Sequence, residues 1–440
     1  MKSEDFIVKT IGKQTISSPL KLSKVIGDGV YDYITPDDRI LFDTSLKNYR
    51  RCVENGETPI SFEKAGPHER LYFDASKTRA AIVTCGGLCP GLNNVIRSLT
   101  LQLWYRYNVR HIYGIQYGYS GFVPESNYPY IELTPDYVTN IHLFGGTVLG
   151  SSRGSQEVED IVDSLERMNV NLLFTIGGDG TLRGAHAIHE EIERRGLKIA
   201  VGGVPKTIDN DISFIERSFG FETAFSIANS VIRDAHNEAR GAPNGVALVK
   251  LMGRDSGFIA ANAALSMQEV NFVLIPEIEF DLRGENGFYA ALKKRLDESG
   301  HAVVVVAEGA GQFLFEDQEV RRDASGNIKH NDIGMFLKKH IPEAFKEFGM
   351  DVTLKYIDPS YIIRSAAANA NDSKFCNQLA RNAVHAAMAG KTDFVVGYWN
   401  SQFTVIPIPV TVKERKRVDI ESELWWGVLE ATGQPTMMKN

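Results

Sequence analysis

The sequence predicts an α/β protein of more than one domain, with mainly parallel sheets covered by helices on both faces. Three observations lead to this fold class. Apolar segments of strand length alternate with helical segments from Thr78 onward, and short runs rich in glycine and acidic residues follow several of the strands. A chain of 440 residues is also long for a single hydrophobic core.

The first part of the chain differs from the rest, because it is polar, rich in turns and interrupted by prolines. We expect residues 1–75 to form an N-terminal extension, residues 76–240 and 241–400 to form two α/β domains, and residues 401–440 to pack back on the body. The expected strands are Ala80–Thr84, Ile112–Gln116, Leu172–Ile176, Ile199–Val204, Val246–Met252, Phe272–Ile275, Ala302–Ala307 and Phe394–Gly397. The expected helices include Leu182–Arg195, Glu222–Glu238, Gly257–Met267, Gly284–Glu298 and Ser373–Met388.

Composition excludes several classes of protein. A net charge of −7 disfavours a general nucleic-acid binder, so an anionic substrate has to be held by local arginines and lysines. No apolar run is long enough to span a membrane, and the first residues lack the layout of a signal peptide. Four cysteines are too few for a disulfide framework, which favours the cytoplasm.

Two runs carry most of the functional signal, Gly177-Gly178-Asp179-Gly180-Thr181 and Pro205-Lys206-Thr207-Ile208-Asp209-Asn210-Asp211. Each places carboxylates among small residues just after an expected strand. Backbone N–H groups of the first run can face an anion at a helix N-terminus, and Asp209 and Asp211 alternate along an extended segment, so they share a face. Each run taken alone is also compatible with an ordinary turn.

Five further runs add glycines, cations and a carboxylate near strand ends. Gly86-Gly87 opens a loop after the first expected strand, and Arg153-Gly154 ends a flexible stretch from Gly145. Their glycines allow a phosphate to approach the backbone, and a guanidinium spans two phosphate oxygens. The other three runs supply Met252-Gly253-Arg254, the carboxylate of Glu308 followed by glycines, and a later group of cations with an aromatic hydroxyl, between Lys355 and Arg364.

Together these runs resemble those of the phosphofructokinase family, over a stretch from about Lys77 to about Trp399. The resemblance implies two Rossmann-like three-layer α/β/α domains and transfer of a phosphoryl group from ATP to the 1-hydroxyl of fructose 6-phosphate, with Mg²⁺. It implies a homo-oligomer, either a dimer or a tetramer. Nucleotide contacts are expected from Gly86, Gly87, Arg153, Gly154, Gly178, Asp179, Gly180 and Thr181. Sugar-phosphate contacts are expected from Thr207, Ile208, Asp209, Met252, Gly253, Arg254, Glu308, Lys355, Tyr361, Ile362, Ile363 and Arg364.

Chemical roles follow from the residue types. Asp209 is the expected proton acceptor for the sugar hydroxyl, because a carboxylate makes the alcohol a better nucleophile as the bond to phosphorus forms. Thr207, Asp211, Lys206 and Arg254 are the expected supporting groups of the catalytic site. Asp179 is the expected ligand of Mg²⁺, directly or through water.

The phosphoryl donor depends on two positions. Gly180 leaves space for the α-phosphate of ATP, where the pyrophosphate-using branch of the family has Asp, whereas Lys206 resembles that branch. Gly180 favours ATP, and pyrophosphate is the near alternative. The sequence also departs from common bacterial members, which have an Arg where Gly245 stands, with Arg240 the nearest substitute, and Arg and His where Lys355 and Tyr361 stand.

Other classes of function are less well supported. A dehydrogenase would need a dinucleotide fingerprint that Gly86–Gly91 does not fit. Nicotinamide-nucleotide and lipid kinases share a Gly-Gly-Asp-Gly run but do not need the Met-Gly-Arg run, and a non-catalytic sugar-phosphate sensor is a third possibility. His186 and His189 have no third ligand at a suitable spacing, so solvated helix residues are expected rather than a metal site.

Overall fold

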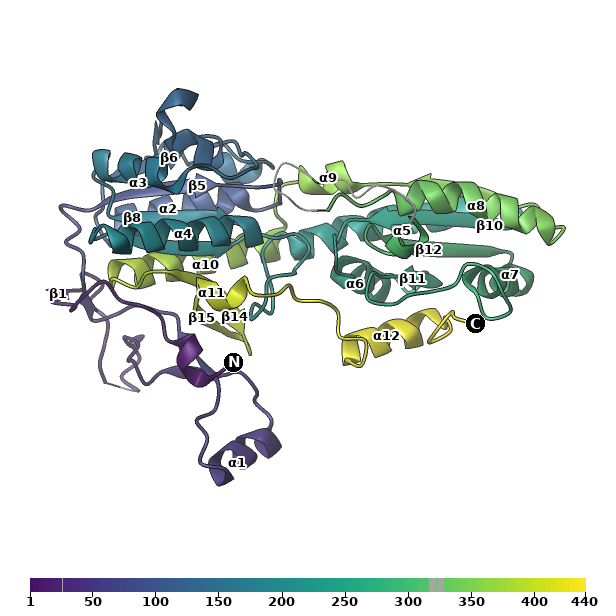
Figure 1. Cartoon of the computed structure of the whole chain (residues 1–440), viewed down its shortest axis with the longest axis horizontal. Coiled ribbons are helices and arrows are strands. Elements are labelled where there is room, and N and C mark those ends of the chain that lie inside the picture. The colour runs from purple at the N-terminus through teal and green to yellow at the C-terminus, as the bar shows by residue number, and fades with distance from the viewer. Residues whose placement is uncertain (26, 316–321, 323–327) are drawn as a thin grey trace. The chain divides into compact units, whose positions relative to one another are not determined.

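The computed structural model describes residues 1–25, 27–315, 322 and 328–440 of the chain. These residues form two compact units, and the chain passes between them repeatedly. Unit 1 contains residues 1–207, 212–220 and 365–415, and unit 2 contains residues 208–211, 221–364 and 416–440, apart from the positions outside the described ranges. Each unit is an α/β structure built around its own sheet (Figure 1).

Unit 1 contains a nine-stranded sheet in the order β2-β3-β15-β14-β9-β8-β5-β6-β7. Its five central strands, β14, β9, β8, β5 and β6, are parallel neighbours, and antiparallel strands complete both edges. The bounds are β2 Arg39–Leu41, β3 Ser61–Lys64, β5 Arg79–Thr84, β6 His111–Ile115, β7 Ile131–Glu132, β8 Leu172–Gly177, β9 Ala200–Pro205, β14 Phe394–Trp399 and β15 Gln402–Pro407. The central strands are almost entirely buried, as expected for parallel strands covered on both faces.

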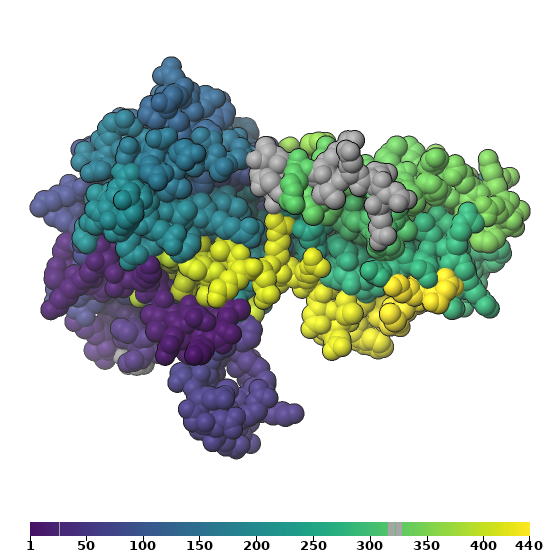
Figure 2. All heavy atoms as spheres, in the orientation of Figure 1, coloured from purple at the N-terminus to yellow at the C-terminus, as the bar shows by residue number. Residues whose placement is uncertain are grey.

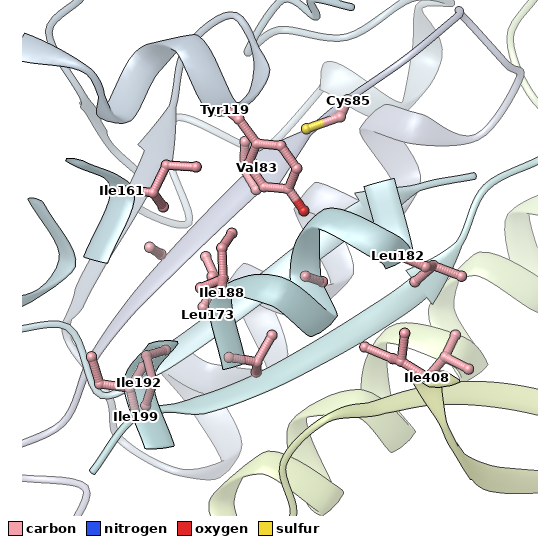
Figure 3. Close-up of a cluster of buried hydrophobic side chains, with 14 of the residues drawn as sticks. Val83, Cys85, Tyr119, Ile161, Leu173, Leu182, Ile188, Ile192, Ile199 and Ile408 are labelled. Atoms are coloured by element: carbon pink, nitrogen blue, oxygen red, sulfur yellow. The ribbon is translucent and has the colours of Figure 1, made fainter. Parts of the chain in front are cut away.

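Helices cover both faces of this sheet. Helices α3 and α4 pack side by side on one face, where α11 also contacts α4, and α2 packs beside α10 on the other. The bounds are α2 Leu92–Arg106, α3 Val158–Arg167, α4 Asp179–Arg194, α10 Ala370–Met388 and α11 Ile408–Thr411. Figure 3 shows the core between α4 and the sheet, in which Ile188 and Ile192 of the helix pack against Val83 and Leu173 of the strands. This packing fixes the start of α4 at the carboxyl end of β8.

Unit 2 contains a four-stranded parallel sheet in the order β11-β12-β10-β13. Helices α5 and α6 contact one part of the sheet, α7 and α8 pack on its core cluster, and α12 packs against α6. The bounds are β10 Gly245–Leu251, β11 Phe272–Leu274, β12 His301–Ala307, β13 Thr353–Ile357, α5 Phe221–Arg240, α6 Phe258–Ser266, α7 Phe288–Ser299, α8 Ile333–Glu347, α9 Ser360–Arg364 and α12 Glu423–Thr432. Four consecutive valines, 303–306, make β12 the buried centre of this sheet.

The N-terminal residues form small elements around unit 1. A two-stranded sheet pairs β1 with β4, and α1 has no buried residue and stands apart from the rest of unit 1 (Figure 2). The bounds of these elements are β1 Ile16–Ser17, β4 Arg70–Leu71 and α1 Leu46–Glu54. The 3₁₀ helices, found here and elsewhere in the chain, are η1 Ser3–Phe6, η2 Gly118–Phe122, η3 Pro124–Ser126, η4 Ile141–Leu143 and η5 Gln312–Phe315. Within the described ranges, no helix has the length and apolar character needed to cross a lipid bilayer.

The observed fold confirms the expected class, and every expected strand is present with ends within two residues of those predicted. Helix α4 begins earlier than expected, at Asp179, because an acidic residue is favourable in the first turn of a helix and Gly180 fits there. Helix α7 begins later than expected, at Phe288, because Gly284 has a left-handed φ of +94° that belongs to a turn.

The unit boundaries differ from the expected domain boundaries. Residues 1–75 are more than an extension, since β2 and β3 join the main sheet of unit 1. Residues 221–240 belong to unit 2, and residues 365–400 belong to unit 1. The C-terminal part divides as well, because β15 pairs with β14 whereas α12 packs in unit 2. The alternation of strands and helices along the chain predicts where the strands lie in the sequence, but it does not determine which sheet each strand joins.

Candidate functional site

The glycine-rich loop after β5 gathers the cations of unit 1. Lys206 Nζ donates a hydrogen bond to the Gly87 carbonyl oxygen at 2.8 Å, and a Cβ on Gly87 would lie 3.3 Å from the Arg153 guanidinium. Ser151 Oγ donates to the Gly86 carbonyl oxygen at 2.6 Å. Four residues expected to act on the nucleotide or the transferred group, far apart in sequence, are therefore neighbours. Two cations beside an open glycine backbone form a local site for an anion.

The Gly-Gly-Asp-Gly run lies beside this loop because β8 and β9 are parallel neighbours. Gly177 pairs with Pro205 at the carboxyl ends of the two strands, and Lys206 N–H donates to the Gly177 carbonyl oxygen at 2.9 Å. A Cβ on Gly180 would have no heavy atom within 4 Å, so this position faces open space. Thr181 is buried, and its carbonyl oxygen accepts a hydrogen bond from the Tyr119 hydroxyl at 2.7 Å.

Asp179 is ion-paired at the start of α4. Its Oδ2 lies 3.0 Å from the Arg183 guanidinium and 3.5 Å from that of Arg415, and its side chain is only 14% exposed. Arg415 lies in the run 413–417, which is short and includes an acid, so its sequence alone would predict a solvated face. Its role could not be found from spacing, since the contact depends on the β15–α11 segment returning to α4.

Asp179 fits the weak type of metal site that uses one carboxylate together with phosphate oxygens. Across the described part of the chain, no group of three or more His, Cys, Asp or Glu side chains could hold a metal ion. A divalent ion at Asp179 would thus depend on the phosphates of a bound nucleotide, and it would compete with the two arginines for the carboxylate.

Asp209 lies in unit 2 among other carboxylates. Burial raises its pKa to about 7, the carboxylates of Asp211 and Glu308 add to the rise, and Arg364 and Arg254 oppose it. These five residues come from four separate stretches of the chain, since Asp209 and Asp211 share one run, and their electrostatic interactions show that the fold gathers them. Asn210, between the two aspartates, has a left-handed φ of +57°, so the segment is a tight turn rather than the expected extended strand.

The Met-Gly-Arg turn is held to the end of β12. Gly253 has a φ of +150° and Arg254 a left-handed φ of +50°, and a Cβ on Gly253 would collide with the Ser256 carbonyl oxygen. Arg254 N–H donates to Glu308 Oε1 at 2.9 Å, and Glu308 N–H donates to the Leu251 carbonyl oxygen at 2.8 Å. Oε1 of Glu308 is thus an acceptor for the protein backbone. Met252, at the start of the turn, is fully buried.

The expected sugar-phosphate cradle lies on β13 and α9. Lys355 is exposed on β13, and Tyr361 is 84% exposed. Ile362 is also exposed, whereas the Ile363 side chain is fully buried, so only the backbone of Ile363 could face a ligand. Of these residues, Arg364 is the one whose charge acts on Asp209.

Gly245 shows why the arginine of common bacterial members is absent. A Cβ at this position would collide with the Ala239 carbonyl oxygen, so the backbone here accepts glycine alone. Arg240 lies at the end of α5 and is exposed.

The two histidines of α4 make contacts within the protein, and His189 is buried rather than solvated, contrary to expectation, whereas His186 is partly exposed. His189 is buried and its Nδ1 lies 3.2 Å from the Thr392 hydroxyl, and His186 Nδ1 lies 3.0 Å from the Asp393 carboxylate. They join α4 to the turn before β14, which explains why this helix is rigidly placed.

Comparison with known proteins identifies relatives over nearly the whole chain. Residues 79–387 match the family model described as Phosphofructokinase. A protein of Borreliella burgdorferi named ATP-dependent 6-phosphofructokinase is 50% identical over 99% of this chain and 98% of its own. A protein of Amycolatopsis methanolica with the same name is 45% identical over 98% of this chain and 95% of its own.

A solved structure supports the fold. The crystal structure of pyrophosphate-dependent phosphofructokinase from Marinobacter aquaeolei superposes with a TM-score of 0.67, at 21% identity, over 81% of this chain and 92% of its own. At that identity the likeness concerns the fold alone. With the family match and the two relatives, the observations lead to one conclusion: this chain belongs to the phosphofructokinase family.

Proposed function

We propose that this chain transfers the γ-phosphoryl group of ATP to the 1-hydroxyl of fructose 6-phosphate and forms fructose 1,6-bisphosphate. The names of relatives at 45–50% identity support this reaction. The observation that carries the mechanism is Asp209, a carboxyl with a pKa of about 7 beside two arginines. A general base is most effective with a pKa near the working pH, and arginines are the usual partners of a sugar phosphate.

Unit 1 contains the groups that we expect to bind the nucleotide. The phosphates would bind over Gly86 and Gly87, with Arg153, Gly154 and the N-terminus of α4 at their edge. Gly178, Gly180 and Thr181 lie at the start of α4, and the backbone N–H groups at the N-terminus of a helix favour a bound anion. Asp179 would hold Mg²⁺, which neutralises charge on the phosphates when it is bound.

Unit 2 contains the groups that we expect to bind the sugar phosphate. Asp209 would accept the proton of the 1-hydroxyl, and Arg254 would balance the charge that develops on the transferred group. Arg364, Lys355 and Tyr361 would bind the 6-phosphate and the sugar ring. The remaining expected contacts are Thr207, the end of the unit 1 segment, and Ile208, Met252, Gly253, Glu308, Ile362 and Ile363 in unit 2. Asp211 supports Asp209 by raising its pKa.

Pyrophosphate is the second candidate donor, and Lys206 is the observation that favours it. Its Nζ donates to the Gly87 carbonyl oxygen, so it orders the loop that faces the phosphates. The open space at Gly180 supports ATP, because an additional phosphate and a nucleoside need that room. We propose ATP as the donor, a homo-oligomer as the active form, either a dimer or a tetramer, and the cytoplasm as the place of reaction.

A coupled assay that follows fructose 1,6-bisphosphate tests this function. The purified chain, fructose 6-phosphate and Mg²⁺ are combined with either ATP or pyrophosphate at equal concentration. The proposal predicts turnover with ATP and a much lower kcat/KM with pyrophosphate. The reverse preference would establish the pyrophosphate-dependent reaction, and binding of fructose 6-phosphate without turnover of either donor would indicate a non-catalytic sensor.

A further inference from the structure

The turn that carries Asp209 and Asp211 is held in place by hydrogen bonds that other segments donate to the carbonyl oxygens of these two residues. Ser256 Oγ lies 3.2 Å from the Asp209 carbonyl oxygen and 3.0 Å from the Gly253 carbonyl oxygen, so its single O–H is shared between these two acceptors. Lys416 N–H donates to the Asp211 carbonyl oxygen at 2.9 Å. The two donors come from segments far apart in sequence, the Met-Gly-Arg turn before α6 and the C-terminal segment before α12. The left-handed Asn210 between the carbonyls needs this support, because that conformation costs free energy in a non-glycine residue.

A single carboxylate oxygen joins the two supporting segments. Glu277 Oε1 accepts a hydrogen bond from Gly257 N–H at 3.0 Å and another from Val418 N–H at 2.8 Å. Gly257 directly follows Ser256, and Val418 lies two positions after Lys416. Displacement of Glu277 would therefore loosen both donors of the turn at once.

The position of Glu277 is costly to the fold, which indicates a specific use. Burial raises its pKa, and the backbone N–H groups of Val418 and Gly257 oppose that rise. Its second oxygen, Oε2, is buried without a hydrogen-bond partner among the residues that the structure describes. A leucine or methionine would fill the same place without the desolvation cost, but neither would accept the two N–H groups.

We infer that Glu277 is a positioning residue of the phosphoryl-transfer site, which sets the place of the Asp209 carboxylate through Ser256 and Lys416. The inference rests on the proposed function, since it assigns Glu277 a part in that reaction. Glu277 follows the end of β11 and touches neither of the groups expected to react. It acts on the backbone of the turn, and the turn carries the base.

Three variants separate positioning from a general loss of stability. Glu277→Ala removes the acceptor, Glu277→Gln keeps one oxygen in the same place, and Glu279→Ala is the matched control. Glu279 lies two residues further on, is exposed, and pairs with Lys439 at the surface. For each variant kcat, both KM values, the pH dependence of kcat/KM and Tm are measured on the full chain beside the wild type.

Positioning predicts a specific pattern of kinetics. Glu277→Ala should lower kcat by about 10–100-fold, the cost typical of a reactive group moved by a fraction of an ångström, with smaller changes in KM for ATP. Its pH profile should shift to lower pH, because a loosened turn exposes Asp209 to solvent. Glu277→Gln should restore most of kcat, and Glu279→Ala should match the wild type.

Other outcomes would overturn the inference. A Glu277→Ala protein that is folded and has wild-type kcat and an unchanged pH profile would show that the carboxylate only stabilises the unit. If Glu277→Ala does not fold, Ser256→Ala breaks one arm of the same connection, and wild-type kcat in that variant would contradict the inference. Inactivity of the wild type in this assay would instead refute the proposed function, so the two failures are distinct.

Discussion

Asp179 and Asp209 both follow buried parallel strands, yet their surroundings have opposite charge. Asp179 in unit 1 is paired with the guanidinium groups of Arg183 and Arg415. Asp209 in unit 2 lies near Asp211 and Glu308, and its pKa is raised to about 7 by burial and by these carboxylates. A carboxylate paired with arginines lies among cations, and these surroundings suit the binding of phosphates. A carboxylate among carboxylates takes up a proton readily and suits the role of base.

The largest expected effect comes from removal of the base. Asp209→Ala should lower kcat by about 10²–10⁴-fold, the loss typical of a general base, while fructose 6-phosphate still binds. Steady-state kinetics and calorimetric titration with fructose 6-phosphate measure the two properties. A near-normal kcat would show that Asp209 is not the base, and the proposed difference in role between Asp179 and Asp209 would then fail.

A negative charge introduced at Gly180 should weaken the use of ATP more than the use of pyrophosphate. Gly180→Asp should lower kcat/KM for ATP by about 10²-fold, because a carboxylate beside a phosphate costs several kcal/mol, and should affect pyrophosphate less. Gly180→Ala is the matched control, since a Cβ there meets no heavy atom within 4 Å. Equal activity of Gly180→Asp with ATP would rule out this account of donor choice.

Removal of a cation from unit 2 should act on the sugar phosphate. Arg364→Ala should raise KM for fructose 6-phosphate by about 10-fold or more, the value of a charge-assisted hydrogen bond, with a smaller change in KM for ATP. Lys294→Ala, which removes an exposed cation from α7, serves as the control. An unchanged KM for the sugar phosphate in Arg364→Ala would exclude Arg364 from the cradle.

The raised pKa of Asp209 also predicts a change in stability. Between pH 3.8 and about 7 the folded chain keeps a proton that the unfolded chain loses, so stability falls as pH rises through this window. Asp209→Asn cannot ionise, and we expect its Tm at pH 8 to exceed that of the wild type by about 2 °C or more. Thermal unfolding from pH 4 to pH 8 tests this, and a gain that does not shrink towards pH 4 would argue against the raised pKa.

The smallest effect is expected where an arginine competes with the metal. Arg183→Ala should lower the Mg²⁺ concentration that gives half-maximal activity by about 2–5-fold, since a largely exposed ion pair contributes roughly 0.2–1 kcal/mol. Lys198→Ala, an exposed cation just beyond the end of α4, is the control. A higher Mg²⁺ requirement in Arg183→Ala would mean that the arginine helps to bind the phosphates instead.

The sequence predicts the parallel strands and the runs that follow them, because buried strands are continuous apolar segments with glycine at their carboxyl ends. It does not predict the antiparallel strands β2, β3 and β15, because β2 and β3 are short and the pairing of β3 with β15 joins residues far apart in sequence. It also misses Arg415 and Glu277. The contacts of Arg415 with Asp179 and of Glu277 with Val418 join residues more than a hundred positions apart, and a single Arg or Glu in the sequence carries no signal of such a contact.

We propose that burial, together with the carboxylates of Asp211 and Glu308, makes Asp209 a base that works near neutral pH. The most direct test is kcat/KM of the wild type for fructose 6-phosphate between pH 5.5 and 8.5, with the ionisation of the substrate measured separately and divided out. We expect kcat/KM for fructose 6-phosphate to fall tenfold per pH unit below an apparent pKa of about 7. A profile that stays flat down to pH 5.5 would contradict it, because Asp209 would then ionise as an ordinary carboxyl group.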